Sequence, residues 1–186
     1  ESVPLECRVD LMRDCAMGLE YLHNSNLLHC DIKSLNYLVT RDLRVKLADL
    51  GEVRPVSQRF SELAEALPVS LNWTSPEVLM DERRAICPRS DVWGLGMVMW
   101  EILTGEVPFD TDEVRGMSTV GFIDAVVNHG MRPALSTEDA PPRLVALLQW
   151  CWEREPQRRP SATKVRRELD GILRELVDAM RTRSSA

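Results

Sequence analysis

The sequence lacks the features that mark fibrous, membrane-spanning, secreted and nucleic-acid-binding proteins. Glycine and proline supply only 9 and 11 of its 186 residues, which excludes a collagen-like or low-complexity chain. No apolar run reaches the roughly 18 residues that a membrane-spanning helix needs, and the first residues show no secretory signal. The net charge of −6 argues against a general nucleic-acid-binding protein, because such proteins are usually basic. We therefore expect a globular protein with no membrane segment and no nucleic-acid partner.

The sequence also lacks paired cysteines, and the placement of its cysteines is informative. The five cysteines are odd in number, lie far apart and form no C-x-x-C pair. This pattern argues against a disulfide scaffold or a zinc ribbon and favours reduced thiols in a cytoplasmic protein. The five are Cys7, Cys15, Cys30, Cys87 and Cys151.

The hydrophobic share of 44% and the charged share of 28% are those of a folded protein with a core. Apolar residues recur at helical spacing over 5–24, which predicts a helix. Residues 27–51 alternate short apolar pieces with polar ones, which predicts short strands joined by loops. Residues 52–72 show no clean period and predict a long exposed loop. From residue 90 onward the pattern is helical, so the expected fold class is α+β and mostly α-helical.

Within the helical part, the most apolar segment is residues 92–103. It is apolar nearly all round, which is typical of a buried central helix, and Gly105 fits its C-cap. Further helices are expected over 119–128 and over 142–152. A last helix is expected after Ser161. Its core face comprises Val165, Leu169, Ile172, Leu176 and Met180.

Polar residues with a specific chemistry gather in the strand-and-loop segment. Asp31, with Lys33 two positions on, suits phosphoryl transfer, because the carboxylate orients a hydroxyl and takes its proton while the lysine neutralises the moving charge. Asn36 and Asp49 supply oxygen ligands of the kind that Mg²⁺ prefers. Gly51 is expected to let the backbone turn sharply, so that Asp49 points into a cleft. Taken alone, Asp31 would more often be a turn or capping residue, but its company with Lys33, Asn36 and Asp49 favours the catalytic role.

Five motifs follow one another along the chain. They are His29-x-Asp31-x-Lys33-x-x-Asn36, Asp49-x-Gly51, Ser75-Pro76-Glu77, Asp91-x-Trp93-x-x-Gly96, and Cys151-Trp152 with Arg159-Pro160. In this order and spacing they resemble the eukaryotic protein kinase family, whose catalytic and magnesium loops they match. The resemblance covers residues 1–178 and only the C-terminal lobe, with 179–186 as a polar tail. The Gly-rich loop and the V-A-I-K lysine of the family have no match, so we expect an N-terminal lobe to precede Glu1 in a longer kinase.

The resemblance assigns roles to the matching residues. It implies that ATP and Mg²⁺ are the cofactors, with Asp31 and Lys33 as catalytic residues and Asn36 and Asp49 as catalytic metal ligands. Lys33 after the aspartate points to serine/threonine specificity. The pattern around Trp73 is similar to the tyrosine kinase-like group. The hydroxyl that this group places three residues before that tryptophan is supplied here by Ser70, a substrate-binding candidate.

Other matching residues are expected to support the site rather than react. His29 and Gly51 shape the two loops. Asp91 is expected to accept hydrogen bonds from the catalytic-loop backbone, although an N-cap of the central helix is the simpler alternative. Glu77 and Arg159 are expected to form a buried ion pair, against the alternative of two unrelated surface charges. The remaining histidines, His23 and His129, are interpreted as surface or helix-end residues.

The sequence departs from the family pattern at several positions. Cys30 stands where the family usually has an arginine that binds a phosphate on the activation loop. A thiol cannot do this, so we predict that phosphorylation within 52–74 is not a strong switch through this contact. Leu50 replaces the commoner phenylalanine, Val69 a usual glycine and Gly94 a usual serine.

Two other functions stay open beside a protein kinase. The first is a pseudokinase or scaffold module on the same fold, since fold alone does not establish activity. The second is a small-molecule phosphotransferase of the aminoglycoside or choline type, which lacks the later motifs found here. The expected partner is a protein substrate. Residues 49–113 carry thirteen acidic and five basic side chains, which favours substrates with basic residues near the acceptor.

Overall fold

A computed structural model gives the arrangement of the chain and describes residues 3–57, 70–80, 86–135 and 140–184. The α-helices are α1 (Leu5–Asn24), α2 (Pro76–Met80), α3 (Pro88–Thr104), α4 (Asp112–Arg115), α5 (Thr119–Val127), α6 (Pro142–Cys151) and α7 (Ala162–Ser184). The strands are β1 (Leu27–Leu28), β2 (Tyr37–Val39), β3 (Val45–Leu47) and β4 (Arg54–Pro55). Short 3-10 turns are η1 (Ser34–Asn36), η2 (Leu50–Glu52), η4 (Leu71–Trp73) and η5 (Pro156–Arg158). The expectation of a mostly helical α+β fold is confirmed.

The central helix α3 forms the middle of the core, with α1 and α6 packed against it. Its residues from Asp91 to Trp100 are all buried, as the all-round apolar pattern of this segment predicts. The helix ends at Gly105, whose φ of 77° is the left-handed conformation that glycine adopts without a steric cost. This buried helix is the support on which the loops of the site rest.

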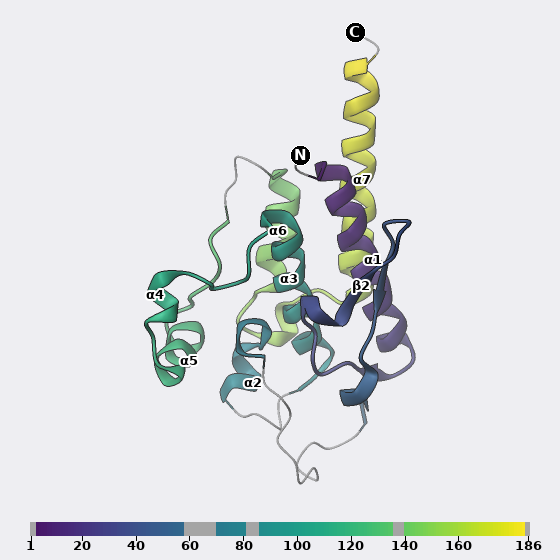
Figure 1. Cartoon of the computed structure of the whole chain (residues 1–186). Coiled ribbons are helices and arrows are strands. Elements are labelled where there is room, and N and C mark those ends of the chain that lie inside the picture. Colours follow the sequence, from purple (N-terminus) through teal and green to yellow (C-terminus); the bar gives the residue numbers. More distant parts are fainter. Residues whose placement is uncertain (1–2, 58–69, 81–85, 136–139, 185–186) are drawn as a thin grey trace.

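Helix α7 runs along α1, and its last turns extend beyond the rest of the helical body (Figure 1). Val165, Leu169 and Ile172 are buried on its core face, whereas Met180 is 39% exposed. The helix continues to Ser184 and so passes the expected start of a polar tail at residue 179. Its apolar face is therefore covered only over the first part of its length.

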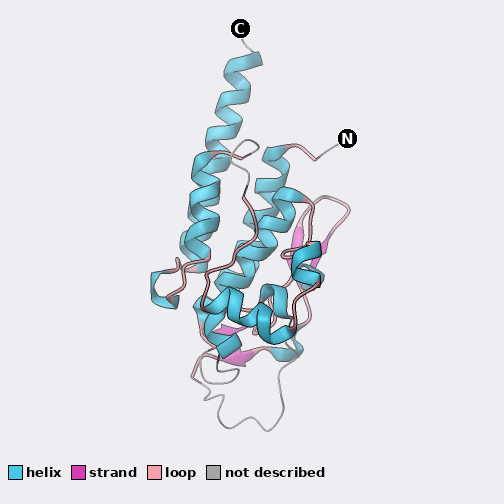
Figure 2. Cartoon of the chain, turned by 90° about the vertical axis from the view of Figure 1, so that its left-hand side faces the viewer, coloured by secondary structure: helices cyan, strands magenta, loops and turns pink. Residues whose placement is uncertain are grey.

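The strand-and-loop segment forms two antiparallel ribbons beside the helices (Figure 2). In the first, Tyr37 of β2 pairs with Leu47 of β3. In the second, Leu28 of β1 pairs with Arg54 of β4. The first three strands lie where the sequence predicts them, but β4 falls inside the segment 52–72 that was expected to be a loop. Within that segment, residues 58–69, including Val69, lie outside the described residues.

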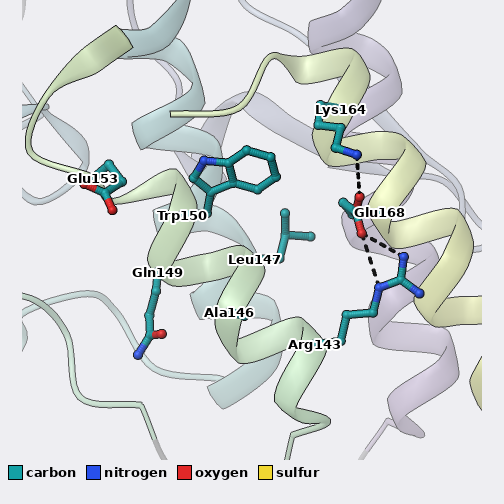
Figure 3. A pocket seen from close by; sticks show the side chains of 8 residues that line it. All are labelled: Arg143, Ala146, Leu147, Gln149, Trp150, Glu153, Lys164 and Glu168. Carbon is teal, nitrogen blue, oxygen red and sulfur yellow. Dashed lines mark hydrogen bonds and ion pairs between the residues drawn. The ribbon is translucent and has the colours of Figure 1, made fainter. Parts of the chain in front are cut away.

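Helices α6 and α7 are joined by a small network of ion pairs. Arg143 on α6 donates to Glu168 on α7 at 2.7 Å, and Lys164 pairs with the same carboxylate at 2.8 Å. These side chains line a pocket of about 620 Å³ whose wall includes Trp150 (Figure 3). Lys164 and Glu168 both lie on α7, so Arg143 is the cation that joins the two helices, through Glu168 and Glu175.

Candidate active site

The catalytic loop is attached to the central helix through one carboxylate. Asp91 accepts hydrogen bonds from the backbone N–H groups of His29 (2.9 Å) and Cys30 (3.0 Å). This is the contact that the sequence predicts for Asp91. The same carboxylate also contacts Nε2 of His23 at 2.9 Å, and the side chain of His23 is only 12% exposed. Of the two alternatives expected for His23, the helix end is confirmed, because it lies in the last turn of α1. The surface alternative is wrong, because this end of α1 packs against Asp91.

His29 is buried and links the two loops of the site. Its Nε2 donates to the carbonyl of Ala48 at 3.1 Å, and its Nδ1 accepts from the backbone N–H of Asp31 at 3.4 Å. Since a carbonyl can only accept, these contacts fit the neutral ring with its hydrogen on Nε2. Both ring nitrogens hold backbone groups, so His29 is placed as a support of Asp31 and not as a base.

Asp31, Lys33 and Ser70 form a closed set of contacts. The Lys33 ammonium lies 2.6 Å from Oδ2 of Asp31. The Ser70 hydroxyl donates to Oδ1 of Asp31 at 3.2 Å and accepts from Lys33 at 3.1 Å. Asp31 and Lys33 come from the catalytic loop, while Ser70 comes from 39 residues further along the chain. The fold therefore brings three predicted site residues together around one carboxylate.

Asn36 and Asp49 are held on neighbouring segments. The side-chain nitrogen of Asn36 donates to the backbone oxygen and to Oδ2 of Asp31, at 2.8 and 3.2 Å. Its amide oxygen is then the group left to bind a cation. The backbone N–H of Ala48 donates to the carbonyl of Asn36 at 2.8 Å, which brings the adjacent Asp49 to the same side. Asp49 itself is exposed.

The sharp turn at the magnesium loop is made by Asp49 and not by Gly51. Asp49 has a φ of 55°, whereas Gly51 is not among the residues with positive φ. An aspartate tolerates this left-handed conformation better than most residues do. A side chain at position 51 would place its Cβ 3.3 Å from Oδ1 of Asp49. The prediction that Gly51 makes the turn is therefore wrong. Gly51 instead lies close to the Asp49 carboxylate, and its backbone N–H donates to Oδ1 of Asp49 at 3.4 Å.

Glu77 and Arg159 form the buried ion pair that the family resemblance implies. Two guanidinium nitrogens of Arg159 donate to the two oxygens of Glu77, each at 2.7 Å. Arg159 also lies 5.0 Å from the ring centre of Trp93. Burial works to raise the pKa of Glu77, but the hydrogen bonds and charge of Arg159 outweigh it and hold that pKa below its usual value. The pair fixes α2 against the helical core.

Glu101 joins the catalytic loop to the segment that carries Ser70, and sequence reasoning did not find it. Its Oε1 accepts from the hydroxyl of Ser34 at 2.9 Å, and its Oε2 accepts from Nε1 of Trp73 at 2.7 Å. Burial raises the pKa of Glu101, although these two hydrogen bonds lower it in part. A signal was present in the sequence, since Glu101 is a charged residue at the end of the apolar run 92–103.

Two further residues set the local shape of the catalytic loop. A Cβ at Gly94 would lie 2.8 Å from the carbonyl oxygen of Ile32, so the loop rests directly on the central helix there. Cys30 has a φ of 68°, and burial, followed by the charge of Asp91, raises the pKa of its thiol. Beside it, Arg54 is bound to the carboxylate of Glu52 at 3.2 Å. Position 30, where the kinase family usually has a phosphate-binding arginine, therefore holds a neutral thiol.

The helical lobe and the loops it supports are those of the C-terminal lobe of a protein kinase. A model of the family described as protein tyrosine and serine/threonine kinase matches residues 1–169. The chain therefore belongs to this family of eukaryotic protein kinases.

Named relatives agree with this assignment. The serine/threonine-protein kinase STY17 of Arabidopsis thaliana is 33% identical over 165 residues, which cover 89% of this chain and 27% of the relative. Mitogen-activated protein kinase kinase kinase 12 of Rattus norvegicus is 32% identical over 162 residues, with 87% and 17% covered. The dual specificity protein kinase shkD of Dictyostelium discoideum is 32% identical over 169 residues, with 89% and 21% covered. The chain thus spans between 17% and 27% of the length of these three proteins.

One finding bears on the membrane expectation. In the described part of the chain, no helix combines the length and the apolar character that crossing a bilayer requires.

Proposed function

We propose that this chain is the catalytic lobe of a serine/threonine protein kinase that transfers the γ-phosphoryl group of ATP to protein hydroxyls. The observation that carries the proposal is the contact of Asp31 with both Lys33 and Ser70. A carboxylate in this setting accepts a hydrogen bond from a hydroxyl, which is how the Ser70 hydroxyl is held in the structure. An acceptor serine or threonine would donate to the same carboxylate beside the Ser70 hydroxyl. It would pass its proton to Asp31 as its oxygen attacks the γ-phosphorus and the bond from that phosphorus to the ADP oxygen breaks.

The neighbouring groups have matching tasks. Lys33 neutralises negative charge on the phosphoryl group in transit. Ser70 keeps Lys33 and Asp31 in register by binding both. The donor set beside them fits magnesium, because the amide oxygen of Asn36 and the exposed carboxylate of Asp49 are hard oxygen ligands. Mg²⁺ bound by Asn36 and Asp49 would offset the charge of the ATP phosphates.

An N-terminal lobe completes the proposed site. Apolar side chains next to the metal ligands are exposed, with Leu38 at 58% and Leu50 at 57%. Leu38 lies in β2, two residues after Asn36, and Leu50 directly follows Asp49, so a second lobe would cover both and close the ATP site. We therefore propose that residues 1–178 are the C-terminal lobe of the kinase domain.

We infer the substrate preference from the acidic residues of the chain and the compartment from its cysteines. The acidic residues between 49 and 113 favour protein substrates with basic residues near the acceptor. The five cysteines are odd in number and widely spaced along the chain, a pattern that favours reduced thiols and a cytoplasmic location.

The test is transfer of labelled phosphate from ATP, with magnesium, by the full-length protein to peptides that differ only in a serine, threonine or tyrosine acceptor. We expect transfer to serine and threonine, and a loss of about a hundredfold to ten-thousandfold in Asp31→Asn. Asp42→Asn, an exposed aspartate in the turn between β2 and β3, is the matched control and should keep full activity. ATP binding without transfer in the unchanged protein would contradict the proposal and favour the pseudokinase alternative.

A further inference from the structure

A second bridge lies beside the contacts of Asp31. The first bridge is Asp31 with Lys33 and Ser70. In the second, Glu101 on α3 accepts from Ser34 on the catalytic loop and from Trp73 on the segment that carries Ser70. The two bridges connect the same two segments of the chain.

The residues of the two bridges are directly linked. Ser34 follows Lys33 in the sequence. The backbone N–H of Trp73 donates to the carbonyl of Ser70 at 2.9 Å. A shift of either segment relative to Glu101 would therefore move Lys33 or Ser70 relative to Asp31.

We propose that Glu101 is a positioning residue that sets the distance between the catalytic loop and the segment of Ser70. The inference rests on the proposed kinase function. Each carboxylate oxygen holds one segment, and α3 provides a rigid base because its residues from Asp91 to Trp100 are buried. Glu101 does not take part in the reaction itself. It acts on the reacting atoms indirectly, by setting the positions of Lys33 and Ser70.

Phosphoryl transfer depends on such placement. A misplacement of about 1 Å can lower the rate on the order of a hundredfold. Loss of the bridge should therefore lower kcat and weaken use of the protein acceptor. Binding of ATP depends on other groups and should change little.

The main variant is Glu101→Ala in the full-length protein. We expect kcat to fall by about tenfold or more while KM for ATP stays within about twofold. Glu101→Gln is the conservative variant, since its amide oxygen can accept from Trp73 while its amide nitrogen donates to the Ser34 oxygen. It should restore most of the lost rate, which a requirement for the charge itself would not allow.

Variants that remove only one of the two donors to Glu101 keep the test decisive if Glu101→Ala does not fold. Ser34→Ala and Trp73→Phe each remove one donor, and each should lower kcat by a smaller factor. Because either change alone breaks the bridge, Ser34→Ala combined with Trp73→Phe should lower kcat little more than the larger of the two single changes. Additive losses would overturn the inference.

A matched control and an independent readout separate position from stability. Glu20→Gln changes a carboxylate that pairs with Arg166 between α1 and α7, and it should leave kcat unchanged. In nuclear magnetic resonance spectra of the chain, the indole N–H signal of Trp73 should move in Glu101→Ala and not in Glu20→Gln. Trp73→Phe identifies that signal by deleting it.

The outcomes distinguish the inference from the function on which it rests. If Asp31→Asn abolishes transfer while Glu101→Ala keeps the kcat of the unchanged protein, the positioning role is wrong and the proposed function stands. If Asp31→Asn keeps full activity, the proposed function fails and the inference fails with it.

Discussion

Arg159 donates two hydrogen bonds to the carboxylate of Glu77, one to each oxygen. The arginine side chain is completely buried, and the glutamate side chain is 14% exposed. Further guanidinium contacts go to backbone carbonyls of Glu153, Arg89 and Arg154. The arginine thus ties α2 to α3 and to the loop before α7. A planar fork of donors is needed for this arrangement, and lysine could not replace it.

Removal of one partner of this pair should strongly destabilise the chain. Arg159→Ala leaves the Glu77 carboxylate buried without its counter-charge, which costs about 3–5 kcal/mol in comparable cases. Denaturant unfolding followed by circular dichroism measures the change. Arg115→Ala breaks a pair with Asp110 in which both side chains are well exposed, so it should change the free energy of unfolding far less. Similar losses in the two variants would contradict the buried-pair account.

The same pair predicts how stability responds to acid. The pKa of Glu77 in the folded chain lies below the ordinary value of 4.5. The unfolded chain therefore takes up the proton first, so the stabilisation is fully present above pH 4.5 and is lost as the pH falls through the lowered pKa. We expect the free energy of unfolding, measured between about pH 6 and pH 3, to fall less steeply in Glu77→Gln than in the unchanged chain. Parallel curves would show that Glu77 does not contribute to the acid response.

Gly94 and Gly96 offer a matched pair of substitutions on one helix. A Cβ at Gly94 would press on the Ile32 carbonyl, between Asp31 and Lys33, whereas a Cβ at Gly96 would lie 2.7 Å from Nε1 of Trp152. Both alanine variants should lose stability in thermal unfolding. Only Gly94→Ala should also lower kcat, by about tenfold, since it displaces the catalytic loop. An equal loss of kcat in Gly96→Ala would contradict a local effect on the loop.

Phosphorylation of the segment after the magnesium loop should have a limited effect on activity. Cys30 offers a neutral thiol where a phosphate-binding arginine would be needed, and Arg54 beside it is already bound to Glu52. Treatment of the full-length protein with a phosphatase should therefore lower its activity by less than about tenfold, or less than about 1.4 kcal/mol of barrier. A mock-treated sample is the control. A larger loss would show that another cation binds the phosphate.

Sequence reasoning located the parts of the site that are contiguous along the chain. Asp31, Lys33 and Asn36 are grouped by short spacing, and the central helix was visible as an apolar run. The Glu77 and Arg159 pair, which is 82 residues apart in the sequence, was found only through the family resemblance. Spacing alone carries no information about such a contact.

The features that sequence reasoning missed depend on tertiary contacts. The contact of His23 with Asp91 joins the end of α1 to α3, and the bridge from Glu101 joins two distant segments. Strand β4 has only two residues, and it exists because Leu28 is available as a partner. A two-residue strand has no periodicity to detect, and a polar side chain shows its partner only when the chain is folded.

The anchoring of the catalytic loop by Asp91 has a consequence for how the site opens. The amides of His29 and Cys30 donate to a side chain on α3 and not to a neighbouring strand. To exchange their hydrogens with water, these amides must separate from the most deeply buried helix of the lobe. We therefore expect the catalytic loop and the core to open together, and the amides of the catalytic loop to share the slow hydrogen exchange of the core.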